Sequence, residues 1–184
     1  FAGWECVGIS SALLIGFFHE RCNAVRAALR AFTTYRICDM GILVASVVIH
    51  QAVGSGDFDR LFGTDWPNGT CLVSAGTATL VSLLLVFASL GKTAQIPFSG
   101  WLPRAMEGPT PSSAIFYGAL SIHAGAYVLL RCESLLEQAP LARLVLIVIG
   151  LGTALHASVV GRVQTDLKSM LAYASMTQAG LIFA

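Results

Sequence analysis

Uncharged, mostly apolar runs alternate with short polar connections along this chain. Two of the runs, residues 71–90 and 111–130, contain no Asp, Glu, Lys or Arg. An apolar helix of about 20 residues is the length that crosses a hydrocarbon core roughly 30 Å thick. A backbone inside lipid must satisfy its own N–H and C=O groups, so these runs favour helices over open strands. The pattern predicts an all-α, polytopic membrane protein.

The same reading along the whole chain predicts a transmembrane bundle of six helices. The runs cover residues 1–18, 37–53, 71–90, 111–130, 144–160 and 170–184. The chain opens on Phe1 and stops inside the last run, so we expect the first and last helices to be cut short. Residues 1–184 are therefore expected to be part of a single transmembrane domain that continues beyond both ends.

Lysine and arginine fall unevenly if the six helices alternate across the membrane. The first side receives Arg21, Arg26, Arg30, Arg36, Lys92, Arg104, Arg162 and Lys168, and the second receives Arg60, Arg131 and Arg143. Short cytoplasmic loops carry the excess of these residues. The first side is therefore predicted to face the cytoplasm, in a bacterial inner membrane, and residues 55–70 are predicted to form an exterior loop.

Composition narrows the classes of function. Charged residues make up 11% of the chain and the net charge is +1, so no basic stripe is available for a nucleic acid. The five cysteines show no CxxC spacing, and no GxGxxG fingerprint is present. We expect no metal, no cofactor and no redox centre in this chain, so any electron transfer would belong to partner subunits.

Lys92 stands out because a charge at the bilayer centre costs at least ~2.5–3.5 kcal/mol on insertion scales. It closes the run 71–90 and is followed closely by Pro97. A proline inside a helix removes a hydrogen bond and clashes with the preceding turn, which predicts a broken helix between Gly91 and Pro97. We expect the carbonyl groups freed at that break to solvate the Lys92 ammonium group.

Glu5 lies inside the first apolar run, and it is the expected partner of Lys92. A lysine at a broken helix, with a carboxylate on another helix, is an arrangement suited to ion or proton transfer, because the carboxylate adjusts how readily the amine exchanges its proton. The alternative is structural. Lys92 would then extend to the cytoplasmic interface, and Glu5 would cap a helix end.

Histidine and a second lysine add further candidates for proton transfer. His123 and His156 lie within uncharged runs and exchange protons near neutral pH, although each could simply hydrogen-bond a neighbouring helix. Asp166 is a plausible N-cap of the last helix and also a possible relay residue. Lys168 lies in the first turn of that helix, where the helix dipole disfavours a cation. It therefore has either a specific partner or the role of an interfacial anchor.

Two segments resemble a known signature. They are GKTAQIPFSGWLPRAMEGPTPSSA at 91–114 and QTDLKSMLAYASMTQAG at 164–180. Both resemble the antiporter-like membrane subunits of proton-pumping NADH:quinone oxidoreductase (complex I), particularly its subunit L or chain 5. The same family includes Mrp-type cation/proton antiporters, membrane-bound hydrogenase subunits and the membrane subunit of bacterial inorganic-carbon uptake complexes. GWECVGISSALLIGFF at 3–18 resembles the family's glutamate-bearing helix.

The resemblance implies that these six helices are part of a larger bundle built from inverted repeats, with a broken helix near Lys92. It also implies roles for particular residues. Glu5 would be the carboxylate that pairs with Lys92 at the broken helix, and Lys168 would be a further polar position of the family motif. The family usually carries a histidine where this chain has Tyr117, and the histidine here is His123 instead. The proton path would then run through His123, or Tyr117 would hold a water. This departure resembles the inorganic-carbon branch.

We therefore expect a proton-translocating, antiporter-like subunit that moves protons through Glu5, Lys92, His123, His156 and Lys168. The alternatives are an inorganic-carbon uptake subunit energised by cation flux, a Na⁺/H⁺ antiporter subunit, and a membrane scaffold that moves no ions. The expected partners are the lipid bilayer, other membrane subunits of a multisubunit complex and a peripheral catalytic subunit. By resemblance, the chain could be classed with the NADH:quinone oxidoreductase translocases.

Overall fold

The computed structural model describes residues 1–57, 61 and 73–184, without the side chains of 116–119. Within that part of the chain every regular element is helical, so the prediction of an all-α protein is confirmed. The predicted exterior loop at 55–70 and the first two residues of the run 71–90 lie mostly outside the described residues.

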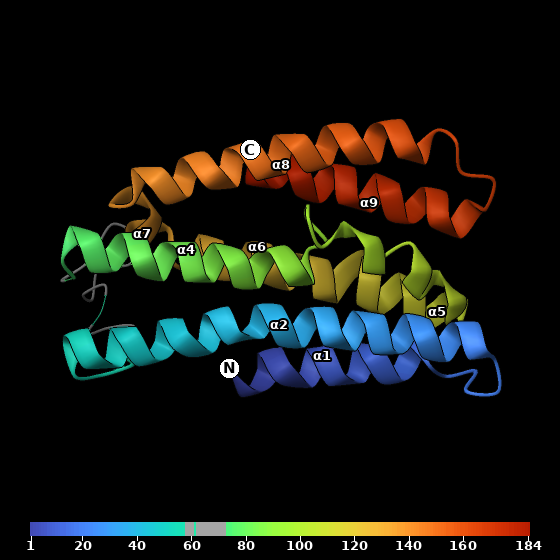
Figure 1. Cartoon of the computed structure of the whole chain (residues 1–184), viewed down its shortest axis with the longest axis horizontal. Coiled ribbons are helices and arrows are strands. Elements are labelled where there is room, and N and C mark those ends of the chain that lie inside the picture. Colours follow the sequence, from blue (N-terminus) through green and yellow to red (C-terminus); the bar gives the residue numbers. More distant parts are fainter. Residues whose placement is uncertain (58–60, 62–72) are drawn as a thin grey trace.

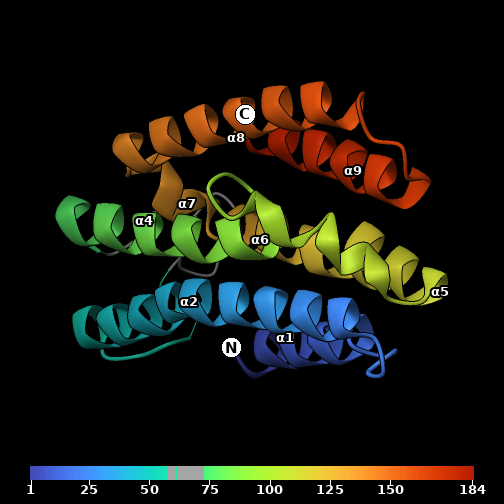
Figure 2. The same cartoon turned by 45° about the vertical axis from the view of Figure 1, so that its right-hand side comes forward.

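The described helices lie side by side along one common direction (Figures 1 and 2). The α1–α2 turn, α5 and the α8–α9 turn meet at one end, on the right of Figure 1, and α7 lies towards the other. The α-helices are α1 (Ala2–Ile15), α2 (Cys22–Val53), α4 (Ala75–Lys92), α5 (Thr110–Ser112), α6 (Ser121–Arg131), α7 (Glu133–Glu137), α8 (Pro140–Gly161) and α9 (Leu167–Phe183). Two 3₁₀ turns, η1 (Ser99–Trp101) and η2 (Arg104–Glu107), and a π-helical stretch, η3 (Ser113–Leu120), complete the described elements.

Three of the described helices, α2, α4 and α8, are long and apolar enough to cross a membrane. Helix α2 begins well before the predicted start at residue 37, so the assignment of Arg26, Arg30 and Arg36 to a loop was wrong. The reason is a helical period in the small and aromatic residues of this region. Its buried positions recur every three or four residues, at Ala24, Ala27, Ala31, Tyr35 and Cys38.

Helix α4 ends at Lys92, and this confirms the break predicted between Gly91 and Pro97. The chain then leaves helical geometry, with Ala94 in the left-handed region at φ 53°. The only regular elements in residues 93–109 are the two short turns η1 and η2. Trp101 and Leu102 of this segment are nevertheless almost completely buried. Non-helical backbone is tolerated at membrane depth where protein covers it, as it does here.

The run 111–130 was predicted as one helix, but it contains α5, η3 and α6 in succession. A π-helix winds more residues into each turn than an α-helix does. The α-helical period counted from the sequence therefore does not carry across Ser113–Leu120.

Several glycines lie where two helices approach each other closely. A Cβ added at Gly91 would overlap the Cβ and Sγ of Cys38 on α2, and one added at Gly41 would lie 2.5 Å from the Leu84 carbonyl oxygen on α4. A similar contact joins α8 and α9, where a Cβ at Gly150 would lie 2.6 Å from the Gly180 carbonyl oxygen. Small residues at such crossings are typical of helix packing in membranes.

Candidate functional site

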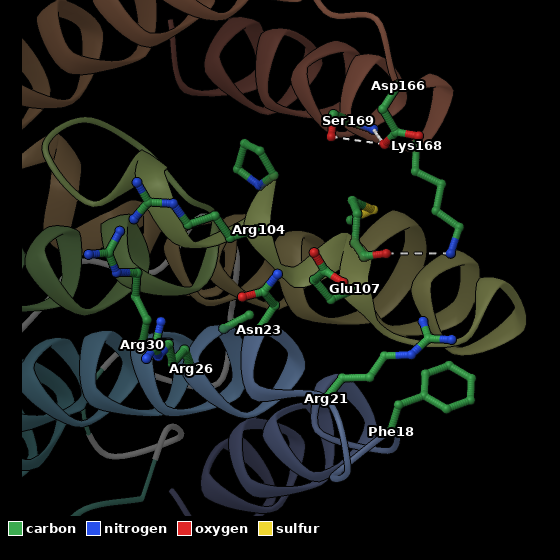
Figure 3. Close-up of a pocket in the computed structure, with 13 residues that line it drawn as sticks. Phe18, Arg21, Asn23, Arg26, Arg30, Arg104, Glu107, Asp166, Lys168 and Ser169 are labelled. Carbon is green, nitrogen blue, oxygen red and sulfur yellow. Dashed lines mark hydrogen bonds between the residues drawn. The ribbon is translucent and has the colours of Figure 1, made fainter.

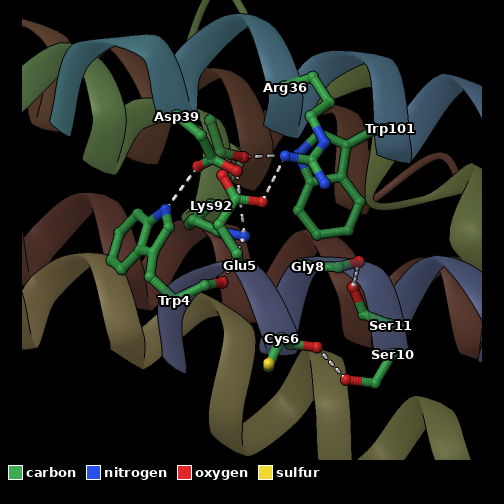
Figure 4. A network of polar contacts seen from close by, with 11 residues as sticks. Trp4, Glu5, Cys6, Gly8, Ser10, Ser11, Arg36, Asp39, Lys92 and Trp101 are labelled. Atoms are coloured by element: carbon green, nitrogen blue, oxygen red, sulfur yellow. Dashed lines mark hydrogen bonds and ion pairs between the residues drawn. The ribbon is translucent and has the colours of Figure 1, made fainter. Parts of the chain in front are cut away.

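Lys92 is fully buried at the C-terminal end of α4, at 0% exposure (Figure 4). Its Nζ lies 3.6 Å from Oδ2 of Asp39 on α2 and donates a hydrogen bond of 3.2 Å to the carbonyl oxygen of Trp4 on α1. The ammonium group also lies 4.4 Å from the ring centre of Tyr35 and 5.3 Å from that of Trp4, within the range of cation–π attraction. The alternative in which Lys92 extends to the interface is therefore wrong.

The carbonyl groups freed at the end of α4 do not all turn towards Lys92, as the break had led us to expect. The indole Nε1 of Trp101 donates a 2.9 Å hydrogen bond to the Gly91 carbonyl, and the Trp101 ring packs edge-to-face on Tyr35 at 4.9 Å. Such aromatic pairs contribute about 0.5–1.5 kcal/mol beyond their buried area. The irregular segment thus covers the end of α4, and the ammonium group takes its carbonyl partner from α1.

Asp39 is a site residue that the sequence reasoning missed. It is 3% exposed, and its Oδ1 accepts a hydrogen bond from Nε1 of Trp4. Its Oδ2 faces Lys92 and has no hydrogen-bond partner among the described residues. It lies near the start of the predicted run 37–53, surrounded by apolar residues. The filter that selected Glu5, a carboxylate inside an apolar run, could therefore have found Asp39 as well.

Glu5 forms its closest ion pair with Arg36 on α2, at 2.6 Å, rather than with Lys92 (Figure 4). The two side chains are 14% and 44% exposed, respectively. Arg36 and Asp39 lie about one helical turn apart on α2, so the Glu5–Arg36 and Asp39–Lys92 pairs are neighbours. The structure thus brings Glu5 and Lys92 into one cluster, with Asp39 and Arg36 as members that connect them.

Gly8 provides the room that the ammonium group occupies. It faces Lys92 from α1, and a Cβ added there would lie only 2.6 Å from Nζ. Trp4 and Gly8 are one helical turn apart, so the same face of α1 supplies both the carbonyl partner and the space.

Lys168 and His123 line one cavity of about 530 Å³ between α6 and α9. Nζ of Lys168 donates hydrogen bonds to the carbonyl oxygens of Gly108, at 3.0 Å, and Met106, at 3.4 Å. This confirms that Lys168 has specific partners. His123 is exposed in the described chain, as is His156 on α8, so the structure does not bring His156 into the cluster around Lys92.

Asp166 caps α9, as the sequence predicted. Its carboxylate accepts hydrogen bonds from the backbone N–H of Ser169 at 2.9 Å and from the hydroxyl of Ser169 at 3.0 Å. These bonds hold the pKa of Asp166 below its ordinary value. Its role is therefore structural in this geometry. The side chain of Tyr117, the other candidate relay residue, lies outside the described residues.

The cluster around Lys92 has the chemistry of a proton-holding site. A buried amine and a buried carboxylate can together hold one or two protons, and each change alters the local charge. Among the described residues no group of three His, Cys, Asp or Glu side chains is placed to bind a metal ion.

Comparisons with known proteins identify relatives of this chain. A family model described as NADH:quinone oxidoreductase/Mrp antiporter, transmembrane, matches residues 1–184. NADH-ubiquinone oxidoreductase chain 5 of Schizophyllum commune is 41% identical over 180 residues, which are 98% of this chain and 26% of that protein. NADH-quinone oxidoreductase subunit L of Rhodobacter capsulatus is 36% identical over 188 residues, covering 100% of this chain and 26% of that protein. The chain thus spans about a quarter of the length of these relatives.

A solved structure gives the same result in three dimensions. The Mrp complex from Dietzia sp. DQ12-45-1b contains a chain that matches 100% of this one at a TM-score of 0.90 and 30% identity, over 20% of its own length. Together with the apolar helices, these similarities identify an integral membrane protein.

Proposed function

This chain belongs to the NADH:quinone oxidoreductase/Mrp antiporter membrane family, and from that premise we propose that it is the proton-loading part of a proton-translocating subunit. The observation that carries the proposal is the Lys92–Asp39 pair, buried at the end of a broken helix with its charged atoms 3.6 Å apart. Ionisable groups this deep in a membrane protein are costly and typically mark ion or proton pathways.

In the proposed mechanism Lys92 holds the proton and Asp39 balances its charge. Lys92 has three N–H donors, and the Trp4 carbonyl takes one of them. The remaining donors and the open Oδ2 of Asp39 leave polar atoms at which a water could deliver or remove a proton. The Glu5–Arg36 pair, at 2.6 Å, lies beside this site, and a change in that pair would alter the electric field at Lys92.

The proposed path between Lys92 and the membrane surface uses the cavity lined by His123 and Lys168. Lys168 and His123 both line this cavity, so each could pass a proton to water there. His156 is the weakest member of the proposed relay because it lies on the exposed face of α8.

Lys92→Ala in the full-length protein, assembled in its own complex and reconstituted in vesicles, tests the proposal. We expect proton uptake, followed with a pH-sensitive dye, to be lost in the complexes that assemble, and their stability to fall because Asp39 loses its buried partner. Arg162→Ala is the matched control, since it removes one exposed positive charge at the α8–α9 turn. Normal proton uptake by the assembled Lys92→Ala complex would overturn the proposal.

A second candidate function is cation/proton exchange, favoured by the TM-score of 0.90 against the Mrp complex chain. It differs from simple proton translocation in that proton movement would require a counter-cation. Vesicles containing the full complex should then show a pH change on addition of Na⁺ and none with an impermeant organic cation. The same assay tests the scaffold alternative, which predicts no ion-dependent pH change at all.

We propose other membrane subunits as partners, because the relatives named above are parts of larger complexes by their printed names. A peripheral catalytic subunit, a bacterial inner membrane and the inorganic-carbon uptake role remain proposals drawn from the sequence. Purification of the full-length protein with its bound partners tests all three.

A further inference from the structure

A cavity of about 960 Å³ opens at the end of the bundle where the α1–α2 turn, η2 and the start of α9 meet (Figure 3). It is lined by five basic side chains and two acidic ones among the described residues. The basic ones are Arg21, Arg26, Arg30, Arg104 and Lys168, and the acidic ones are Glu107 and Asp166. The proton-loading cluster uses none of the four arginines.

The five basic side chains outnumber the two acidic ones, so an excess of positive charge remains in this cavity among the described residues. Asp166 accepts hydrogen bonds from Ser169. Lys168 donates hydrogen bonds to the carbonyl oxygens of Met106 and Gly108. In the described part of the chain no carboxylate lies within ion-pair distance of Arg26, Arg30 or Arg104. An anion in the cavity would supply the missing charge, and guanidinium groups bind phosphate oxygens in forked pairs.

The backbone favours an anion at the same place. Arg26 and Arg30 lie one helical turn apart on α2, so both can approach a single ligand. Helix α2 begins here with Arg21 as its N-cap, which makes no side-chain capping bond, and its first turn holds no acidic residue. The N–H groups of that turn add a positive partial charge facing the same end of the bundle.

The position in the membrane identifies the kind of anion. The cavity lies at one end of helices that can cross the membrane, on the side predicted to carry most of the lysines and arginines. Phe18 lines it at 36% exposure, and Leu29 beside Arg30 is 60% exposed, so apolar surface adjoins the charged groups. A ligand with a phosphate and acyl chains matches both features.

We propose that this cavity binds the phosphate headgroup of an anionic phospholipid from the adjacent leaflet. Basic pockets between membrane helices on the cytoplasmic side are suited to such headgroups. The phospholipid would add a further link between the α1–α2 turn, η2 and the start of α9, beside the hydrogen bonds that Lys168 donates to Met106 and Gly108.

The test uses the full-length protein in its native complex, titrated with phosphatidylglycerol and separately with phosphatidylcholine in detergent, with bound lipid counted by native mass spectrometry. We expect phosphatidylglycerol to bind more tightly. Arg26→Gln combined with Arg30→Gln should weaken that binding about fivefold for each arginine removed, because a basic residue near an anionic lipid is worth roughly 1 kcal/mol. Proton uptake is measured separately on the same variants, so that failure of lipid binding is distinguished from failure of the proposed proton pathway.

Two control variants make the result decisive. Arg162→Gln removes an exposed arginine from the same end of the bundle that does not line the cavity, and should leave the binding unchanged. Arg26→Lys combined with Arg30→Lys should retain most of the binding. Equal binding of the two lipids, equal loss in the Arg162→Gln control, or complete displacement of phosphatidylglycerol by inorganic phosphate or ATP would each overturn the assignment.

Discussion

Two lysines lie at opposite ends of the irregular segment 93–109, and their surroundings differ sharply. Lys92, at its start, is completely buried between Asp39, Tyr35 and the Trp4 carbonyl. Lys168 contacts its end, where it is half-buried and bonds to the carbonyl oxygens of Met106 and Gly108. Lys92 faces a carboxylate, whereas Lys168 faces two backbone carbonyl groups. Lys168 also lines both of the cavities described above.

The contrast separates a charge that the fold must neutralise from one that water can reach. Burial without a partner is very costly for an ammonium group, so the Lys92 end depends on Asp39. Partial exposure lets water solvate the Lys168 side chain. We therefore expect changes at the Lys92 end to have the larger effects, and each prediction below tests that order.

Removing the counter-charge of Lys92 should have the largest effect. Asp39→Asn leaves a fully buried ammonium group without its carboxylate, which costs about 3–5 kcal/mol when a buried pair is broken on one side. We expect a lower melting temperature of the solubilised full complex and loss of proton uptake. The double variant Asp39→Asn with Lys92→Met should recover stability but not proton uptake. A stable, fully active Asp39→Asn complex would contradict the account of the pair.

Filling the space beside Lys92 should come next. Gly8→Ala places a methyl group 2.6 Å from the current Nζ position, so the ammonium group must move away from Asp39 or α1 must shift. We expect proton uptake to fall about tenfold, since a displaced group loses the geometry needed for transfer. Gly3→Ala, on the same helix with nothing within 4 Å, is the matched control. Equal effects of the two changes would show that helix propensity, not space at Lys92, is responsible.

Changing the half-buried lysine, Lys168, should have a moderate effect. Lys168→Met removes two hydrogen bonds from a charged donor but keeps most of the aliphatic side chain. Because water can replace part of the loss, we expect a destabilisation of about 1.5 kcal/mol or less. Proton uptake should slow without being abolished. The measurement is thermal unfolding together with initial uptake rate, and complete loss of uptake in an assembled complex would place Lys168 on a par with Lys92.

The smallest effect is expected at the cap of α9. The pKa of Asp166 is lowered from its ordinary value of 3.8, chiefly by the backbone N–H of Ser169, so the ionised carboxylate stabilises the folded state above that pH. This contribution is lost as the pH falls through the lower, folded value. Asp166→Asn does not titrate, so the wild-type advantage in melting temperature should shrink below pH ~4. A difference independent of pH would indicate that hydrogen bonding alone is involved.

Much of the fold could be predicted from the chain because lipid imposes simple rules. The apolar runs located most of the long described helices to within a few residues, apart from the starts of α2 and α6, and Pro97 located the break after Lys92. The π-helical stretch Ser113–Leu120 could not be predicted, since it leaves no mark in an apolar run. The early start of α2 was missed because Arg26, Arg30 and Arg36 lower the hydropathy of its first turns, as the polar residues of a loop would.

The sequence by itself determined that a lysine would stand at a helix break and that carboxylates lay within apolar runs. Only the tertiary structure decided that Asp39 faces Lys92 while Glu5 binds Arg36. The physical reason is that ion pairing depends on distances of a few ångströms between helices far apart in sequence. Those distances are set by close contacts such as Gly91 against Cys38 and Gly8 against Lys92, which involve the shapes of both partners at once.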